Sequence, residues 1–135
     1  MSEPGLFGFH ALCQTLLRIV AGLLFMPHGA QKLFGMFGGF GGTPRAAVPL
    51  GSMLGLAGVL EFFGGLLLVA GLFTRPVALL LSGEMAVAYF TVHLPKGLFP
   101  IANGGELALL YSFVFLAIAA AGGGSFSLDR VAFKR

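Results

Sequence analysis

The segment at residues 16–35 decides how this chain must fold. It reads LLRIVAGLLFMPHGAQKLFG, an apolar run close to the roughly 20 residues that cross a bilayer as a helix. Four polar side chains interrupt it: Arg18, His28, Gln31 and Lys32. Strongly polar groups inside an apolar span face the protein interior and find partners there. The rest of the chain supplies candidate partners in or beside its own apolar runs: Glu61, Glu84 and Glu106.

Composition indicates a membrane protein. Of the 135 residues, 57% are hydrophobic and 10% are charged, whereas about a quarter of a globular protein is charged. Four spans with their connections use the whole length, so we expect one domain over residues 1–135. Cys13 is the only cysteine and cannot form a dithiol pair. The net charge of +3 arises from cations in loops and near the C-terminus. Such cations set the orientation of a membrane protein in the bilayer, and this placement argues against nucleic acid binding.

Four apolar runs separated by glycine and proline predict an all-α integral membrane protein, a four-helix transmembrane bundle. The expected helices cover residues 12–34, 51–72, 75–93 and 104–121. Pro27 removes one backbone hydrogen bond from the first helix and favours a kink beside His28. Four spans place both termini on one side, near Arg75, Arg130, Lys134 and Arg135, with Lys32, Arg45 and Lys96 toward the other. This bias predicts cytoplasmic termini.

Depth counting along the helices gives the buried charges neighbours. At about 1.5 Å per residue, Arg18 comes near the depth of Glu61 and Glu84, so we expect one buried layer in which Arg18 pairs with a glutamate. Small residues share a face with each acid, which allows close helix approach: Gly58 and Gly65 beside Glu61, Ala88 and Thr91 beside Glu84. Two acids and one arginine leave a surplus charge or a bound proton. The layer could serve packing alone, or it could handle protons.

The other polar candidates each have a structural and a functional interpretation. His28, Gln31 and Lys32 share a helix face by their spacing. Lys32 could extend to the lipid headgroups, and His28 could be a core histidine bonded to a freed carbonyl or a group that binds protons or ligand. Asn103 and Glu106 have capping-box spacing, which accounts for Glu106 without chemistry.

His93 lies opposite Glu84 on an ideal helix, so the two share a site only if that helix ends early. His28 and His93 could be axial haem ligands, but nothing else in the sequence supports haem. The Glu-x-x-His pattern of di-iron bundles is absent, and so are flavin, metal and phosphate-loop motifs. The identity of any cofactor therefore stays open at this point.

Three blocks of the chain together resemble the DoxX family of small bacterial membrane proteins. They are residues 16–35, residues 61–81 (EFFGGLLLVAGLFTRPVALLL) and residues 103–130 (NGGELALLYSFVFLAIAAAGGGSFSLDR). The most specific features are Arg18, the His-Gly-x-Gln-Lys run at 28–32, Glu61-x-x-Gly-Gly, Asn103-Gly-Gly-Glu106 and the closing glycine run to Asp129. Gly123 stands where the family usually has proline. The resemblance implies a multi-pass protein of the bacterial cytoplasmic (inner) membrane, associated with a quinone-linked, sulfur or oxidative-stress redox system.

The implied roles are binding of a quinone-like ligand or anchoring of a soluble or membrane redox partner, and the sequence leaves open whether the chain is an enzyme. A quinone needs an apolar slot with donors or acids at its oxygens. The spans offer Phe62, Phe63, Phe90 and Phe113 beside His28, Lys32, Glu61 and Glu84. Electrons would come from a partner. The alternatives are a scaffold without chemistry of its own, also as a homo-oligomer, and a small proton-coupled transporter.

Overall fold

The computed structural model describes residues 4–42 and 47–134, and within these ranges every regular element is helical. Four apolar helices build the bundle: α1 (Pro4–Phe34), α2 (Met53–Ala70), α3 (Thr74–Ala88) and α5 (Glu106–Ala121). Segments Gly8–Phe34, Met53–Ala70 and Thr74–Lys96 are long and apolar enough to cross a membrane, and α5 is a shorter apolar helix beside them. The chain is thus the all-α membrane bundle that the sequence predicts.

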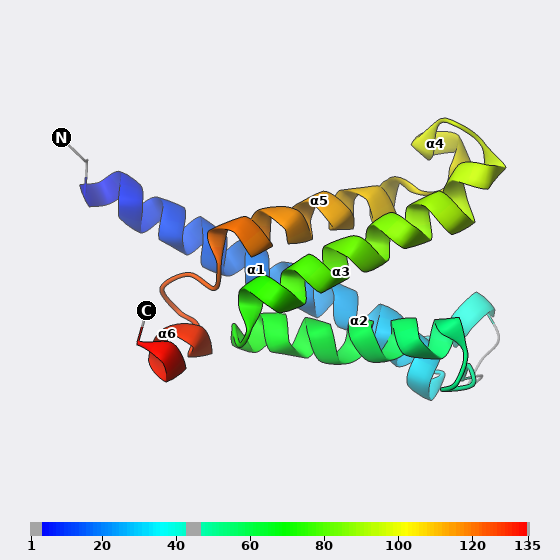
Figure 1. Cartoon of the computed structure of the whole chain (residues 1–135), viewed down its shortest axis with the longest axis horizontal. Coiled ribbons are helices and arrows are strands. Elements are labelled where there is room, and N and C mark those ends of the chain that lie inside the picture. Colours follow the sequence, from blue (N-terminus) through cyan, green and yellow to red (C-terminus); the bar gives the residue numbers. More distant parts are fainter. Residues whose placement is uncertain (1–3, 43–46, 135) are drawn as a thin grey trace.

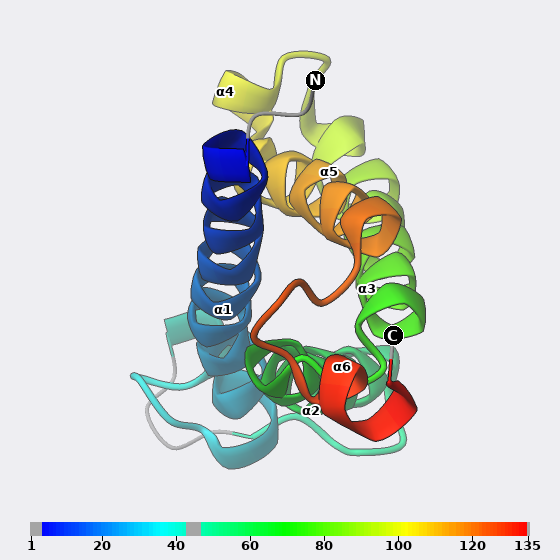
Figure 2. The same ribbon diagram turned by 90° about the vertical axis from the view of Figure 1, so that its left-hand side faces the viewer.

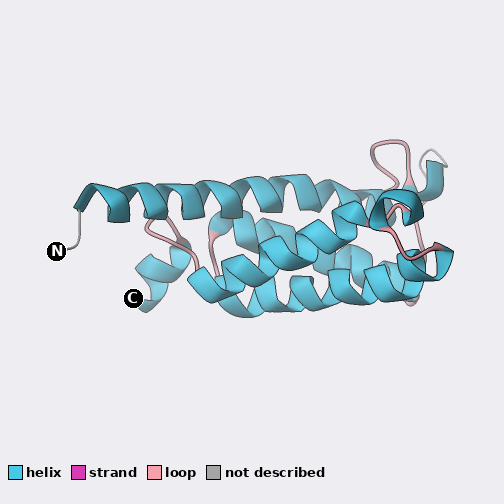
Figure 3. Ribbon diagram, turned by 90° about the horizontal axis from the view of Figure 1, so that it is seen from above, coloured by secondary structure: helices cyan, strands magenta, loops and turns pink. Residues whose placement is uncertain are grey.

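Short helical segments complete the described part of the chain. They are η1 (Phe40–Gly42), the π turn η2 (Tyr89–His93), η3 (Leu94–Lys96), α4 (Pro100–Asn103) and α6 (Leu128–Phe133). The start of α1 and α6 lie at one end of the bundle, which we call the terminal end (Figures 1 and 3). The start of α2 and the segment α4 lie at the opposite end, the loop end (Figure 1).

The bundle consists of two helix pairs. The most extensive packing joins α1 to α2 and α3 to α5. Helices α2 and α3 are joined by a short turn at the terminal end and diverge toward the loop end (Figure 1). Seen from the terminal end, the four helices surround the bundle axis, and the segment after α5 crosses this end to reach α6 (Figure 2). The two pairs therefore lie closest together at the terminal end.

Glycines bring α1 and α2 into backbone contact. A Cβ atom on Gly29 would lie 2.7 Å from the carbonyl oxygen of Gly58, and one on Gly22 would lie 2.7 Å from that of Gly65. Both distances are far shorter than a van der Waals contact, so no side chain fits at either position. Glu61 lies buried on this same face of α2. The expected small-residue face around Glu61 is confirmed.

A reciprocal pair of hydrogen bonds joins α3 to α5. The Ser82 hydroxyl donates to the backbone oxygen of Ser112 at 2.7 Å, and the Ser112 hydroxyl donates to that of Ser82 at 2.9 Å. Small polar residues hold transmembrane helices together in this way because lipid offers them no alternative partner. The core beside this clasp is apolar and includes the fully buried Leu81, Phe115 and Ile118.

Helix boundaries differ from those expected mainly in α1. This helix begins at Pro4, not near residue 12, and continues through Pro27 to Phe34. Helix α2 begins after Ser52, whose hydroxyl accepts from the Gly55 N–H at 3.0 Å, and ends at Gly71 with φ of 72°. These are ordinary start and stop signals. The early start of α1 means that α1 extends beyond the end of α2 at the terminal end.

Candidate functional site

A cleft of about 1000 Å³ opens where α2 and α3 diverge, and α1 and α5 also contribute to its lining. Most of the lining side chains are apolar, including Leu56, Leu60, Leu79 and Leu80. Its ionisable residues are His28, Lys32, Glu61, Glu84, His93 and Tyr111. We call His28, Lys32, Glu61 and Glu84 the cleft cluster. An apolar cavity with a few convergent polar groups is the usual form of a ligand site.

Lys32 and Glu61 form a buried ion pair between α1 and α2. Lys32 Nζ lies 2.7 Å from Glu61 Oε2, and the two residues are 8% and 4% exposed. The ammonium also donates to the backbone oxygen of His28 at 3.4 Å and lies 5.1 Å from the centre of the Phe40 ring. Lys32 therefore does not extend to the headgroups, because Glu61 in the protein interior binds its charge.

Glu84 is the surplus acid of the cleft cluster. Both of its carboxyl oxygens are buried, and neither has a hydrogen-bond partner among the described residues. Lys32, a cation that lines the same cleft, already forms an ion pair with Glu61. Ala88 and Thr91 line the cleft together with Glu84, as their spacing predicts. A buried carboxyl group without a partner is costly and is an indicator of function.

Aromatic rings surround His28, which is half-buried. Its ring centre lies 6.2 Å from that of Phe25 and 6.3 Å from that of Tyr111, the latter edge-on. Tyr111 is a cleft residue that our reading of the sequence missed. The available signal was that Tyr89 and Tyr111 are the only tyrosines of the chain, so that Tyr111 alone adds a hydroxyl-bearing ring to the apolar helix α5.

A π turn brings His93 into the same cleft as Glu84. The segment Tyr89–His93 continues α3 with wider turns, closed by the hydrogen bond from Leu94 N–H to the Tyr89 oxygen. The extra residue in such a turn rotates all later side chains by about 100° relative to an α-helix. His93 and Glu84 therefore both line the cleft, and the regular α-helix does end early, at Ala88, as a shared site requires. The His93 Nδ1 atom lies 3.3 Å from the backbone oxygen of Asn103.

Arg18 does not pair with a glutamate, which overturns the expected buried layer. Its guanidinium is fully buried and donates to four backbone oxygens: those of Leu68, Val69, Gly123 and Phe126. We call Arg18 and these carbonyls the Arg18 cluster. These acceptor carbonyls belong to the end of α2 and to the segment that crosses the terminal end (Figure 2).

The register of α1 on α2 explains this correction. The contacts of Gly22 with Gly65 and of Gly29 with Gly58 fix antiparallel helices so that Arg18 meets the last turn of α2. Glu61 then lies about 10 Å farther along the helix axis, where Lys32 meets it. The expectation took the first two helices to be level at their ends, whereas the glycine contacts set α1 so that it extends beyond the end of α2 at the terminal end.

Asp129 fastens the segment after α5 to the start of α3. Its carboxylate accepts from the N–H groups of Phe73 at 2.7 Å and Thr74 at 2.9 Å. Its own N–H donates to the Gly71 oxygen at 2.9 Å. Partial burial alone would raise the pKa of Asp129, but the N–H donors of Thr74 and Phe73 and the positive charge of Arg18 hold this pKa below its ordinary value.

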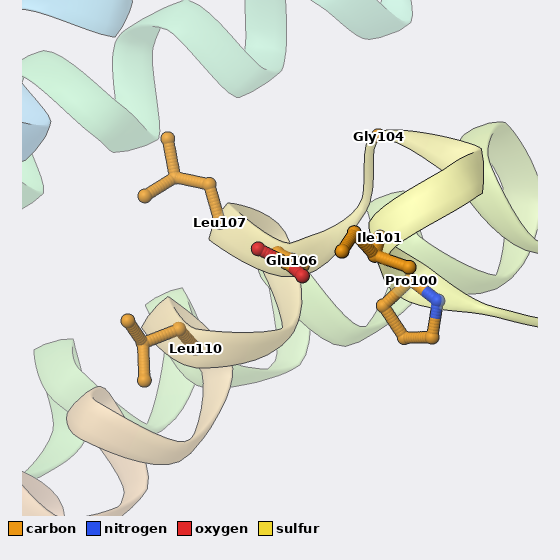
Figure 4. A pocket seen from close by; sticks show the side chains of 6 residues that line it. All are labelled: Pro100, Ile101, Gly104, Glu106, Leu107 and Leu110. Carbon is orange, nitrogen blue, oxygen red and sulfur yellow. The ribbon is translucent and has the colours of Figure 1, made fainter.

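Besides Arg18, two more of the candidates, Gln31 and Glu106, do not line the cleft. Gln31 donates to the Phe37 backbone oxygen at 3.2 Å. Glu106 is exposed and borders a neighbouring pocket of about 360 Å³ with Pro100, Ile101 and Leu110 (Figure 4); this pocket shares Gly104 and Leu107 with the cleft. The expected capping box does not form, because α5 begins only at Glu106 after Gly105. The Asn103 side chain instead accepts from the Gly105 N–H at 2.7 Å.

The phenylalanines proposed for an apolar slot also lie elsewhere. Phe62, Phe63, Phe90 and Phe113 are not among the residues that line the cleft. Phe63, Phe90 and Phe113 are more than half exposed on the outside of the bundle, where lipid surrounds a membrane protein. The aromatic part of the cleft lining comes from Phe25, Phe40 and Tyr111.

Comparison with known proteins gives a consistent picture. A family model described as DoxX matches residues 13–94. An uncharacterized protein of Haemophilus influenzae is 48% identical over 130 residues, which cover 90% of this chain and 91% of that protein. The Escherichia coli "Inner membrane protein YqjF" is 33% identical, with 87% and 90% covered. The Bacillus subtilis "Putative oxidoreductase CatD" is 30% identical, with 88% and 86% covered. No solved structure matches the chain.

Proposed function

This chain belongs to the DoxX family, and we propose that it is an inner-membrane protein whose cleft binds the head of a lipid-soluble quinone. The observation that carries the proposal is the combination of a large apolar cleft, a buried ion pair and a buried carboxyl group without a partner. One relative carries the name "Inner membrane protein" and another the name "Putative oxidoreductase", and both names support the proposal.

The cleft suits an amphiphilic redox-active ring. A volume of about 1000 Å³ is at the upper end of ordinary ligand pockets and accommodates a ring with part of an isoprenoid tail. Reduction of a quinone to a quinol takes up two protons, and acids placed at the ring oxygens are the groups that supply them. In this proposal Glu84 supplies such a proton, and His28 and His93, which also line the cleft, are further proton carriers.

Electrons come from a partner protein in this proposal. Cys13 is the only cysteine of the chain, so the chain has no dithiol of its own to transfer electrons. The proposal places the terminal end in the cytoplasm, and the cations of its segments, Arg75 at the start of α3 and Arg130 and Lys134 in and after α6, support this orientation. Lys32 is buried in the bundle and no longer counts as a loop charge on the opposite side, which strengthens the bias.

Gly83 offers a direct test. It lines the cleft beside Glu84, and a Cβ atom built on it meets nothing within 4 Å. Gly83→Leu therefore adds a side chain at an open position and should narrow the cleft. Gly8→Leu is the matched control, because Gly8 is also an open helical glycine but lies on α1 near the terminal end, away from the cleft lining.

Binding of decylubiquinone to the purified protein in nanodiscs provides the measurement. We expect saturable binding by the natural chain and by Gly8→Leu, and binding at least about tenfold weaker by Gly83→Leu, with melting temperatures no lower than that of the natural chain. Phe63→Ala should bind normally, since Phe63 lies outside the cleft. If Gly83→Leu binds as tightly as the control, the cleft is not the site. If none of the proteins binds the quinone, the scaffold interpretation replaces the proposal.

A further inference from the structure

The cleft cluster holds one more acid than its cation can neutralise. Lys32 and Glu61 form one ion pair at 2.7 Å, and this pair is electrically neutral as a unit. Glu84 remains, with both oxygens buried and without a hydrogen-bond partner in the described ranges. An ionised carboxylate is strongly disfavoured where neither water nor a donor reaches it.

The other titratable groups around Glu84 do not neutralise it. From α1, His28 packs against the rings of Phe25 and Tyr111, and Lys32 is bound by Glu61. From α2 the only facing charge is Glu61, which is of the same sign. Tyr111 on α5 and His93 on the π turn line the cleft, and His93 Nδ1 lies against the Asn103 oxygen. A proton on Glu84 itself is therefore the simplest source of neutrality.

We propose that Glu84 holds a proton and that, when its side chain turns its covered carboxyl group into the cleft that Glu84 lines, the O–H donates a hydrogen bond to a carbonyl oxygen of the bound quinone. This inference rests on the proposed function, since it assigns the group that recognises the ligand. A protonated carboxyl group has a donor, whereas an ionised one only accepts. The quinone form, whose oxygens only accept, is thus bound while Glu84 is protonated, and this preference is lost when Glu84 ionises.

Lys32 is positioned to supply a second donor. An ammonium group has three N–H donors, and two of them are directed to Glu61 Oε2 and to the His28 oxygen. One remains for a ligand in the cleft that Lys32 lines. The cleft therefore presents donors from α1 and α3, which suits a ring with two carbonyl oxygens. The same reasoning makes Glu61 a poor test residue, because its removal would leave the Lys32 charge unpaired.

The first experiment tests whether Glu84 carries a proton before any quinone is added. Dicyclohexylcarbodiimide reacts with protonated carboxyl groups in apolar surroundings, where the carboxyl O–H adds across one C=N bond and no group leaves. We expect mass spectrometry to find Glu84 modified at neutral pH, with Glu61 unmodified, and less modification as the pH is raised. Decylubiquinone should protect Glu84. An unmodified Glu84 at neutral and acidic pH would overturn the proposal.

The second experiment measures decylubiquinone binding across pH. Glu84→Gln keeps a donor of the same shape and should bind within about threefold of the natural chain, whereas Glu84→Leu should bind about tenfold more weakly. Binding by the natural chain should weaken as the pH rises, and binding by Glu84→Gln should lose this change. Glu106→Gln is the matched control, because Glu106 is an exposed acid outside the cleft, and it should keep the natural pH dependence.

The outcomes separate this inference from the proposed function. If the natural chain binds the quinone but Glu84→Gln and Glu84→Leu both bind normally at every pH, the quinone site stands and the assignment of Glu84 is wrong. If Glu84→Gln loses binding as completely as Glu84→Leu, the charge of Glu84 and not its proton is needed, which also overturns the inference. If the natural chain does not bind, the proposed function fails first.

Discussion

The Arg18 cluster and the cleft cluster both bury a cation of α1, yet they differ in how its charge is satisfied. Arg18 donates to four backbone oxygens from two segments. Lys32 forms an ion pair with Glu61, whereas Glu84, the other acid of the cleft cluster, has no partner among the described residues. Beside Lys32 lies the cleft, and Arg18 is not among the residues that line it. A network that saturates its charge stabilises a fold, whereas a surplus group beside a cavity is available to a ligand.

The chemistry of the acceptors explains why the two clusters have different uses. Backbone carbonyls neither take up protons at ordinary pH nor move, so the Arg18 cluster has a single state. Carboxyl groups exchange protons and change their hydrogen bonding when they do. The cleft cluster can thus respond to a ligand, and the Arg18 cluster holds the terminal end closed while it does so.

Loss of Arg18 should have the largest effect on stability. Arg18→Leu leaves four carbonyl oxygens without their donor, and we expect the free energy of unfolding to fall by about 4 to 6 kcal/mol. Titration with denaturing detergent in mixed micelles measures this change. Arg18→Lys should recover only part of the loss, because a single ammonium cannot match the planar guanidinium. A loss below about 1 kcal/mol, typical of surface changes, would contradict a structural role.

The ion pair of the cleft cluster should show a different pattern. Lys32→Met leaves Glu61 buried and unpaired, which we expect to cost about 3 kcal/mol. Lys32→Met with Glu61→Leu removes both charges and should regain most of that stability. The same unfolding assay applies. If the double variant loses as much stability as the two single variants together, the pair is not coupled. If it has normal stability but does not bind the quinone, the contrast with Arg18 becomes sharper.

Asp129, whose carboxylate feels the charge of Arg18, should make the stability of the protein depend on pH. Its folded-state pKa is depressed, so its contribution to stability is present above the unfolded value, about 3.9, and is lost as the pH falls through the folded value. Asp129→Ala removes the bonds to Phe73 and Thr74 and should cost about 1 to 2 kcal/mol at pH 7. The natural chain should lose this advantage on acidification from about pH 5 to below pH 3. An equal acid dependence of both proteins would refute the assignment.

The smallest expected effect concerns Gly83 at the cleft. Gly83→Ala meets no neighbouring atom within 4 Å and should stabilise α3 by about 0.5 to 1 kcal/mol through helix propensity. Gly29→Ala is the contrasting change, because its Cβ would overlap the backbone of α2. Thermal melting compares the two variants. A destabilised Gly83→Ala protein would mean that the cleft is not open at this position.

Much of the fold followed from local features of the sequence. Four apolar runs with glycine and proline between them predicted the four-helix membrane bundle, and the spacing of Gly58 and Gly65 beside Glu61 predicted the face on which α1 packs. The grouping of Glu84 with Ala88 and Thr91 on one face of α3 was predicted in the same way. Each of these depends only on helix periodicity and on hydropathy, which neighbouring residues determine.

The pairing of charges was decided by tertiary structure. The cost of burying a charge predicts that Arg18 and Lys32 find partners, but helix register decides which ones. That register is set by contacts between Gly22 and Gly65 and by the overhang of α1, which join residues far apart in the chain. The π turn that brings His93 beside Glu84 in the cleft likewise changes helix phase without a sequence pattern to announce it. Sequence determined that polar groups had to be buried, and three-dimensional packing determined which of them met.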